Sequence, residues 1–151
     1  MIQIRAIGKL KTNTPESELI ADYVKKSREK IEIREYVEKK ALSDHELKDA
    51  EAQLLLSDMP ENAFIVALDE HGQTLSSREF AQILKTAKDN ARPIVLMIGG
   101  ANGHGQEVLK KAHLKLSFGR MTLPHFLARV ILTEQIYRIK TILDGHPYHR
   151  D

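Results

Sequence analysis

The sequence contains no cysteine and no tryptophan, and it has no uninterrupted apolar run long enough to cross a membrane. Without cysteine the chain cannot form disulfide bonds, bind a metal ion through thiolates or use a cysteine nucleophile. A membrane-spanning helix needs roughly 18 or more apolar residues. The first ten residues, MIQIRAIGKL, also lack the apolar core of a secretory signal. We therefore expect a cytoplasmic protein that makes no use of a membrane.

The net charge is also low, at +2 with histidine neutral, but the charged residues are unevenly distributed. Residues 104–151 hold eight basic and four acidic side chains, together with five of the seven histidines. A basic end of this kind suits a polyanionic partner, although a solvated basic rim has the same composition. Charge alone leaves both interpretations open.

The chain has 151 residues, of which 42% are hydrophobic and 29% charged, as in ordinary globular proteins. This length supports one domain with a hydrophobic core and is too short for two. The sequence contains no internal repeat and no low-complexity linker. We expect a single domain that comprises residues 1–151.

Strand-like and helix-like segments alternate from one end of the chain to the other. Thr14 and Pro15 mark the start of the first helix, and Ser43 with Glu46 predicts a capping box at the second. The alternation predicts an α/β fold with a mainly parallel sheet covered by helices on both faces. The predicted strands are 2–8, 31–37, 63–69, 93–100 and 114–118, and the predicted helices are 14–30, 43–59, 76–90, 105–113 and 124–145.

The last predicted helix has apolar residues on more than one side, whereas docking on a sheet needs only a single apolar stripe. A second apolar side needs a second partner, and another copy of the same helix would give a symmetric homodimer. Complete burial within one chain is the alternative. The apolar residues are Phe126, Leu127, Val130, Ile131, Leu132, Ile136, Tyr137, Ile139, Ile142 and Leu143.

Two segments follow buried strands, at the edge where parallel α/β proteins bind ligands: Val66–Gly72 and Met97–Gly105. The second, MIGGANGHG, has four glycines, which allow the backbone to approach a ligand closely. It is not a phosphate-binding loop, because Gln106 and Glu107 stand where lysine and serine or threonine are required. It also lacks the GxGxxG order of a dinucleotide site. The pattern favours an uncharged nucleoside-like ligand or a sulfonium ligand held by the backbone, while a simple tight turn is the alternative.

His125 stands at the start of the last predicted helix, and Arg129 follows one turn later. The helix dipole disfavours a protonated imidazole there, so His125 is a candidate general base; a cap or surface role is the alternative. Two more histidines, His146 and His149, lie in the polar tail Gly145–Asp151. They have too few potential partners for a metal site. A frayed, solvated terminus is the simplest interpretation of this tail.

Four motifs, IGGANG, MTLPH, RVILTEQIYR and HPYHR, together resemble those of a known family. The family is that of ribosomal RNA large subunit methyltransferase H, SPOUT-class enzymes that methylate N3 of a pseudouridine in 23S ribosomal RNA. The resemblance covers nearly the whole chain. One departure is that many members have Gly-Gly-Pro-Glu-Gly where Gly99–Gly103 is Gly-Gly-Ala-Asn-Gly here.

The resemblance implies a trefoil knot in the C-terminal half and a homodimer packed partly through the last helix. It implies S-adenosylmethionine as the cofactor, while the lack of ligands leads us to expect no metal ion. Because the 151 residues include no appended RNA-binding domain, we expect a structured target within the assembled large subunit or the 70S ribosome. The implied cofactor-binding residues are Leu68, Gly99, Phe118, Gly119, Arg120, Met121, Thr122 and Leu123.

By the same resemblance, the tail reaches the active site, where Tyr148, His149 and Arg150 contact RNA or the target base. Loss of the proton from N3 would be assisted by either His125 or His149, and we leave this choice open. Arg129 and Arg150 would orient the RNA and stabilise negative charge on the pyrimidine carbonyls. A non-catalytic RNA- or ribosome-binding module and a transfer-RNA methyltransferase of the same fold are the alternatives.

Overall fold

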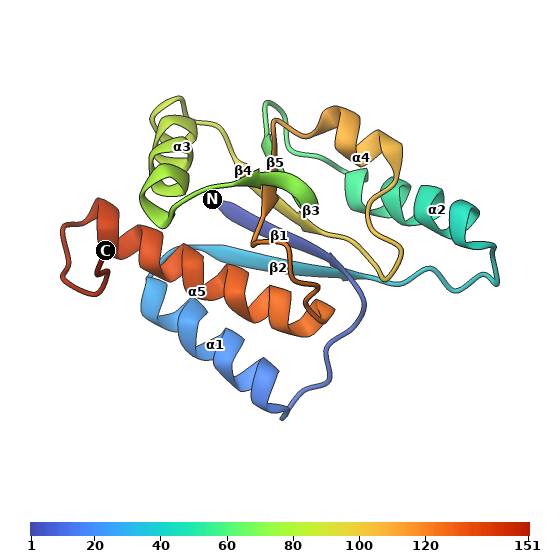
Figure 1. Cartoon of the computed structure of the whole chain (residues 1–151), viewed down its shortest axis with the longest axis horizontal. Coiled ribbons are helices and arrows are strands. Elements are labelled where there is room, and N and C mark those ends of the chain that lie inside the picture. The colour runs from blue at the N-terminus through green and yellow to red at the C-terminus, as the bar shows by residue number, and fades with distance from the viewer.

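Five parallel strands form one sheet in the order β2-β1-β4-β3-β5, as seen in a computed structural model that describes all residues, Met1–Asp151 (Figure 1). Strands and helices alternate without exception, so the predicted α/β class is confirmed. The strands are β1 (Ile2–Ile7), β2 (Ile31–Tyr36), β3 (Phe64–Thr74), β4 (Ile94–Ile98) and β5 (Leu114–Ser117). The helices are α1 (Pro15–Ser27), α2 (Asp44–Leu56), α3 (Ser77–Asp89), α4 (Gln106–Lys111) and α5 (His125–Leu143).

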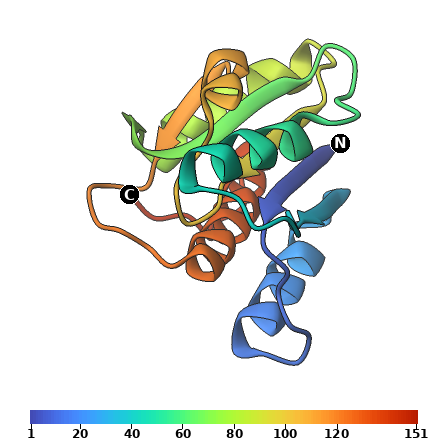
Figure 2. The same cartoon turned by 90° about the vertical axis from the view of Figure 1, so that its right-hand side faces the viewer.

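Helices cover both faces of this sheet (Figures 1 and 2). The larger apolar core joins α3 and α5 to one face, where α1 packs against α5, and the smaller core joins α2 and α4 to the other face. The chain moves across the sheet in one direction through α1 and α3, which lie on one face, and in the other direction through α2 and α4, which lie on the opposite face. The four crossovers therefore share one hand, as the twist of parallel strands requires. As a result, the carboxyl ends of all five strands lie along one edge.

Every residue of β1 is buried, although the sequence pattern of this strand alternates between apolar and polar. Ile2, Ile4 and Ala6 belong to the larger core. Gln3 and Arg5 point to the opposite face, where alternation predicts solvent, but α2 covers that face. Both polar side chains are buried because α2 lies over this side of β1.

The fully buried guanidinium of Arg5 caps the C-terminal end of α2. It donates to the carbonyl of Leu55 at 2.9 Å, to that of Ser57, and to that of Asp58 at 3.0 Å. The last turn of α2 contains no basic residue of its own, so its exposed carbonyls depend on this charge from the sheet. The guanidinium Nε donates to the Gln3 side chain at 3.0 Å, which completes its bonding.

The predicted helix starts are confirmed in position, with one difference in detail. The Thr14 hydroxyl accepts from the Ser17 N–H, and the Ser17 hydroxyl accepts from the Thr14 N–H, so α1 has a full capping box. At α2 the Ser43 hydroxyl accepts from the Glu46 N–H at 3.3 Å. The Glu46 carboxylate accepts from the Ser43 hydroxyl at 2.7 Å and not from its N–H, so only half of the predicted capping box forms.

Helix α5 lies between α1 and α3 on the sheet, and these neighbours cover much of its second apolar side (Figure 1). Leu132, Ile136 and Ile139 are buried, whereas Phe126 and Leu127 are exposed near its start. The alternative of burial within one chain therefore applies to most of the helix, and the first turn keeps an uncovered apolar surface. None of the helices is both long and apolar enough to span a lipid bilayer.

We predict that Arg5→Met lowers the free energy of unfolding by about 3 kcal/mol, because it leaves several buried carbonyls without a donor. Urea unfolding followed by circular dichroism measures this loss. Arg34→Met is the matched control, since Arg34 lies on the neighbouring strand with a side chain that is 39% exposed. A loss for Arg5→Met no larger than that of the control would contradict the capping role.

Candidate functional site

Three segments meet where β3, β4 and β5 end, since these strands are neighbours in the sheet. They are an excursion within β3 at residues 69–72, the glycine loop Gly99–Gly105, and the segment 118–124 that leads into α5. Parallel α/β proteins bind their ligands at this edge. The two strand ends singled out in the sequence are thus brought together with the segment before His125.

The excursion within β3 differs from the sequence pattern, which indicates a strand that stops at residue 69. Instead β3 leaves β5 after Leu68 and returns at Gln73, and both of these residues pair with Leu116. Gly72 makes the return possible, since a Cβ at this position would lie 2.5 Å from the backbone oxygen of Lys115. Only a residue without a side chain fits there.

The Ser117 hydroxyl joins the excursion to the segment after β5. It lies 3.1 Å from the carbonyl of Glu70 and 3.0 Å from that of Gly119, and it accepts from the Gly119 N–H at 3.0 Å. Gly119 has φ +122°, a conformation that favours glycine. The hydroxyl therefore holds the turn from which residues 120–124 run to α5.

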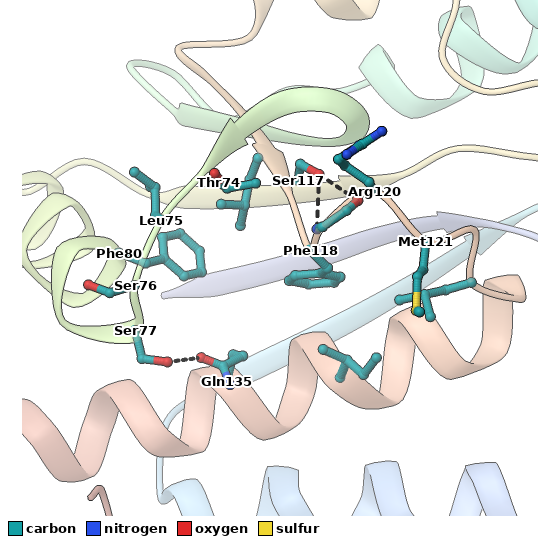
Figure 3. Close-up of a pocket in the computed structure, with 14 residues that line it drawn as sticks. Thr74, Leu75, Ser76, Ser77, Phe80, Ser117, Phe118, Arg120, Met121 and Gln135 are labelled. Atoms are coloured by element: carbon teal, nitrogen blue, oxygen red, sulfur yellow. Dashed lines mark hydrogen bonds between the residues drawn. The ribbon is translucent and has the colours of Figure 1, made fainter. Parts of the chain in front are cut away.

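A cavity of about 570 Å³ lies between this turn, α3 and α5 (Figure 3). Its size falls in the range of small-molecule sites. The Phe118 ring faces into it, and the Ser77 hydroxyl closes one end by donating to the Gln135 side chain at 2.7 Å. The walls are residues 74–77, Phe80, residues 116–121, Leu123, Ile131 and Gln135.

Five of the predicted cofactor-binding residues line this cavity and three do not. Leu68 packs against the larger core together with Phe118, and Gly99 lies in the glycine loop. Thr122 is exposed beside the cavity. The five residues that line it are Phe118, Gly119, Arg120, Met121 and Leu123.

The glycine loop is tightly packed at its start and open in its middle. A Cβ on Gly99 would lie 3.1 Å from Nδ1 of His104, so there is little room for a side chain. Gly103 has φ +80° and open space on the side where a Cβ would point, and its N–H donates to the carbonyl of Gly100 at 3.0 Å. Asn102, the residue that departs from the family pattern, lies 3.5 Å from the Asp44 carboxylate.

His125 is the first residue of α5 and is bonded to the glycine loop. Its Nδ1 lies 3.1 Å from the carbonyl oxygen of Gly99. A carbonyl only accepts, so Nδ1 carries the hydrogen and the neutral ring keeps its lone pair at Nε2. This tautomer has the form that a general base needs.

Two buried groups beside the glycine loop were missed in the sequence. His104 is 8% exposed, its Nε2 donates to the carbonyl of Met97 at 3.2 Å, and its Nδ1 has no partner. Burial lowers the pKa of His104. Glu51 on α2 is 7% exposed, one of its oxygens has no partner, and burial raises its pKa. The only signal for Glu51 was an acid at helical spacing among the apolar residues Ala52 and Leu55.

Arg129, predicted to orient RNA, is 1% exposed and bonded within the chain. It donates to the Glu35 carboxylate at 2.5 Å and to the carbonyl of Gly8 at 3.1 Å. Although burial opposes it, the bonds from the Leu10 N–H and from Arg129 lower the pKa of Glu35. The pair ties α5 to the carboxyl ends of β1 and β2.

The tail after Gly145 folds back on α5. The Tyr148 hydroxyl donates to the Glu134 carboxylate at 3.0 Å, and its ring lies 4.6 Å from that of Tyr137 and 4.8 Å from the guanidinium of Arg138. Burial and the bond to Glu134 raise the pKa of Tyr148 to about 12. The tail is therefore packed at this residue and does not fray.

The residues after Tyr148 are held by a chain of polar contacts. His149 places Nδ1 3.1 Å from Arg138 and Nε2 3.0 Å from Asp151. Asp151 in turn accepts from Arg78 on α3 at 2.7 Å. Arg150 is exposed.

Within one chain the structure does not bring His125 and the tail together. Tyr148 and His149 contact Glu134 and Arg138, which lie in the middle of α5, while His125 is its first residue. At 1.5 Å per residue, Glu134 is about 13 Å along the axis from His125. The structure contains no group of three or more histidine or acidic side chains that could hold a metal ion.

The fold and the site define a parallel α/β protein with a ligand-sized cavity and a glycine loop at the carboxyl edge of its sheet. Residues 1–149 match the family described as "Predicted SPOUT methyltransferase". The chain belongs to this family of SPOUT methyltransferases.

Several relatives carry one name, "Ribosomal RNA large subunit methyltransferase H". The protein of Paramagnetospirillum magneticum is 45% identical to this chain, and the match covers 97% of each. That of Rhodospirillum rubrum is 43% identical with the same coverage. That of Methylocella silvestris is 42% identical over 96% of each chain.

A solved structure is also similar to this chain. It is that of a probable methylase family protein from Haemophilus influenzae Rd KW20, with a TM-score of 0.54 over 99% of this chain and 70% of that chain. The sequence identity is 11%, so the similarity shows a shared fold alone.

We predict that Glu134→Gln moves the pKa of Tyr148 from about 12 toward the ordinary tyrosine value, because the amide carries no negative charge. A pKa that is higher in the folded than in the unfolded state stabilises the fold below about pH 10, and this contribution disappears as the pH rises to about 12. The stability of the wild type should therefore fall over this interval, and that of the variant should fall less.

Tyrosinate absorbance during an alkaline titration measures this pKa, and Tyr148→Phe identifies the signal of Tyr148 among the four tyrosines. If Tyr148 ionises together with the other three in the wild type, its docking against Glu134 is wrong.

Proposed function

We propose that this protein transfers a methyl group from S-adenosylmethionine to N3 of a pseudouridine in 23S ribosomal RNA, within the assembled large subunit or the 70S ribosome. The observation that carries the proposal is His125, whose Nδ1 is held by Gly99 so that Nε2 is free to accept a proton. Relatives named for the large-subunit ribosomal RNA support the choice of substrate. Such a substrate would put the reaction in the cytoplasm, where ribosomes are.

The residues at the carboxyl edge fit S-adenosylmethionine. The cavity has the volume of a nucleoside-sized site, and Phe80, Leu116 and Phe118 supply apolar surface for an adenine ring. Arg120, the one charged residue of the lining, could pair with a carboxylate. The cofactor would supply a methyl group activated on a sulfonium. Leu68, Gly99 and Thr122 would complete the site, and the trefoil knot of the family would lie at this same edge.

In this mechanism His125 accepts the proton of N3 at its Nε2. Loss of this proton would leave N3 with the lone pair it needs to take the methyl group, whose bond to the sulfonium would break, and the imidazole of His125 would carry the positive charge. The ring then returns the proton to water. Most of the acceleration comes from holding the reacting atoms in line. His149 is the alternative base.

A homodimer would resolve the separation between His125 and the tail. Three apolar side chains near the start of α5 are exposed, Met121, Phe126 and Leu127, and a second copy of the chain could cover them. The tail of one protomer would then reach the site of the other. There Tyr148 could stack on a base and Arg150 could hold a phosphate. Arg129 would serve the reaction by fixing the start of α5, since its side chain is internal.

We predict that the protein labels a single pseudouridine of 23S ribosomal RNA when it is incubated with radiolabelled S-adenosylmethionine and ribosomes from cells that lack this activity. Free RNA should be methylated far less, because the single α/β sheet with its helices would recognise the shape of a structured target. Nuclease digestion maps the label.

Other outcomes would favour the alternatives. Cofactor binding without label on ribosomes, but with label on transfer RNA, would indicate the transfer-RNA methyltransferase. Absence of both cofactor binding and label would indicate the non-catalytic RNA-binding module.

We predict that replacing the base by alanine lowers the single-turnover rate about 100-fold, the usual contribution of a general base. His125→Ala and His149→Ala are compared at saturating cofactor. His45→Ala is the matched control, since its side chain is 86% exposed on α2. Near-normal rates in both test variants would exclude histidine-assisted deprotonation.

A further inference from the structure

Glu51 lies on α2 with its carboxylate pressed against the glycine loop. A Cβ on Gly100 would lie 2.7 Å from Oε1 and 2.9 Å from Oε2, so this glycine leaves the space that the carboxylate occupies. Glu51 is 7% exposed, on the buried side of α2 with Ala52 and Leu55. An acid on the apolar side of a helix needs a partner, because burial without one is costly.

The chain supplies no such partner for Oε1, which has no hydrogen bond. The two other large buried charges have charged or carbonyl partners, since Arg5 donates to three carbonyls and Arg129 is paired with Glu35, although Nε of Arg129 also lacks a partner. Burial raises the pKa of Glu51, the charge of His125 lowers it, and that of Glu38 raises it. Oε1 of Glu51 therefore lacks the hydrogen bond that a buried carboxylate oxygen normally has.

The residue that favours the ionised carboxylate is His125, the proposed base. The two are connected through consecutive residues, because His125 donates to the carbonyl of Gly99 while Glu51 packs on Gly100. They approach this turn from opposite faces of the sheet, one from α2 and one from α5. When His125 accepts a proton, its positive charge therefore lies across the Gly99–Gly100 turn from the carboxylate of Glu51.

We propose that Glu51 is a positioning residue for His125: its carboxylate holds the Gly99–Gly100 turn and stabilises the imidazolium that forms when His125 accepts the proton from N3. The inference rests on the proposed function. The effect is reciprocal, since a charge that favours the imidazolium is itself favoured by it. It resembles the use of a buried carboxylate behind a catalytic histidine in hydrolases, although here the two act across a turn of backbone.

The first test compares Glu51→Gln, which keeps the shape and removes the charge, with Asp49→Asn as the matched control on the exposed side of α2. Single-turnover methyl transfer to ribosomes is measured across pH, with cofactor affinity and thermal stability measured in parallel. We expect the rate of Glu51→Gln to fall about 10- to 100-fold. Cofactor affinity should stay within about twofold and the melting temperature should be equal or higher, because a buried charge is removed. Asp49→Asn should match the wild type.

The second test places Glu51→Gln in the His125→Ala background. If Glu51 acts through His125, the additional loss should vanish there, since coupled residues are not additive. An equal loss in both backgrounds would overturn the proposal. So would a lower melting temperature with weaker cofactor binding, which would indicate a structural role.

A third measurement is independent of methyl transfer. In the cofactor-free protein, the titration midpoint of the Glu51 side-chain carboxyl, followed by nuclear magnetic resonance, should move to higher pH in His125→Ala and stay in place in His45→Ala, because the charge of His125 lowers the pKa of Glu51. No movement would overturn the link between the two residues. A movement without any methylation by the wild type would support the link and locate the failure in the proposed function.

Discussion

The site depends on the absence of side chains at Gly99 and Gly100, where β4 ends. At this point helices from opposite faces of the sheet come together, because His125 of α5 donates to Gly99 and Glu51 of α2 packs on Gly100. Any larger residue at Gly100 would displace the carboxylate, and one at Gly99 would meet His104. A parallel sheet normally keeps its two helical layers apart, and two consecutive glycines at its edge remove that separation.

Buried charge is used in two different ways in this chain. Arg5 and Arg129 are fully enclosed, and each donates to several acceptors that belong to distant segments. Their hydrogen bonds fix the relative positions of helices and strands, which apolar packing alone would leave less well defined. Glu51 is buried to a similar degree but no group of the chain donates to its Oε1, whereas Arg129 keeps only its Nε without a partner. A charge bonded to distant segments serves the architecture, whereas one without such bonds marks a place where the molecule accepts strain for another purpose.

Most of the fold could be predicted from the sequence, because hydrophobic periodicity and capping residues act locally. Thr14 and Ser76 begin helices where their patterns indicate. The second half of β3 could not be predicted, since its pairing depends on a distant strand and on the close approach of Gly72 to Lys115. Burial of Arg5 was hidden for a similar reason: alternation along β1 does not reveal that a helix will cover its polar side.

The candidate site was predicted more unevenly. The glycine loop and His125 were singled out because they are contiguous motifs at strand or helix ends, whereas the segment from Phe118 to Leu123 was proposed as cofactor-binding through the resemblance, and five of its residues line the cavity. Glu51 was missed because one acid within a helix carries no signal until its neighbours in space are known. The tail was recognised through resemblance, yet its docking against Glu134 and Arg138 depends on a fold that no local pattern contains.

The order of strands also bears on how the chain folds. Ile2 at the start of β1 pairs with Ile31 on one side and with Ile94 on the other, so the β1–β4 pair joins segments from the two halves of the chain. A ribbon of β1 and β2 alone is too small to be stable by itself. The larger core becomes complete only with β4 and α5. Folding therefore depends on contacts between residues far apart in the sequence, which slows a parallel sheet and leaves its apolar strands exposed until those contacts form.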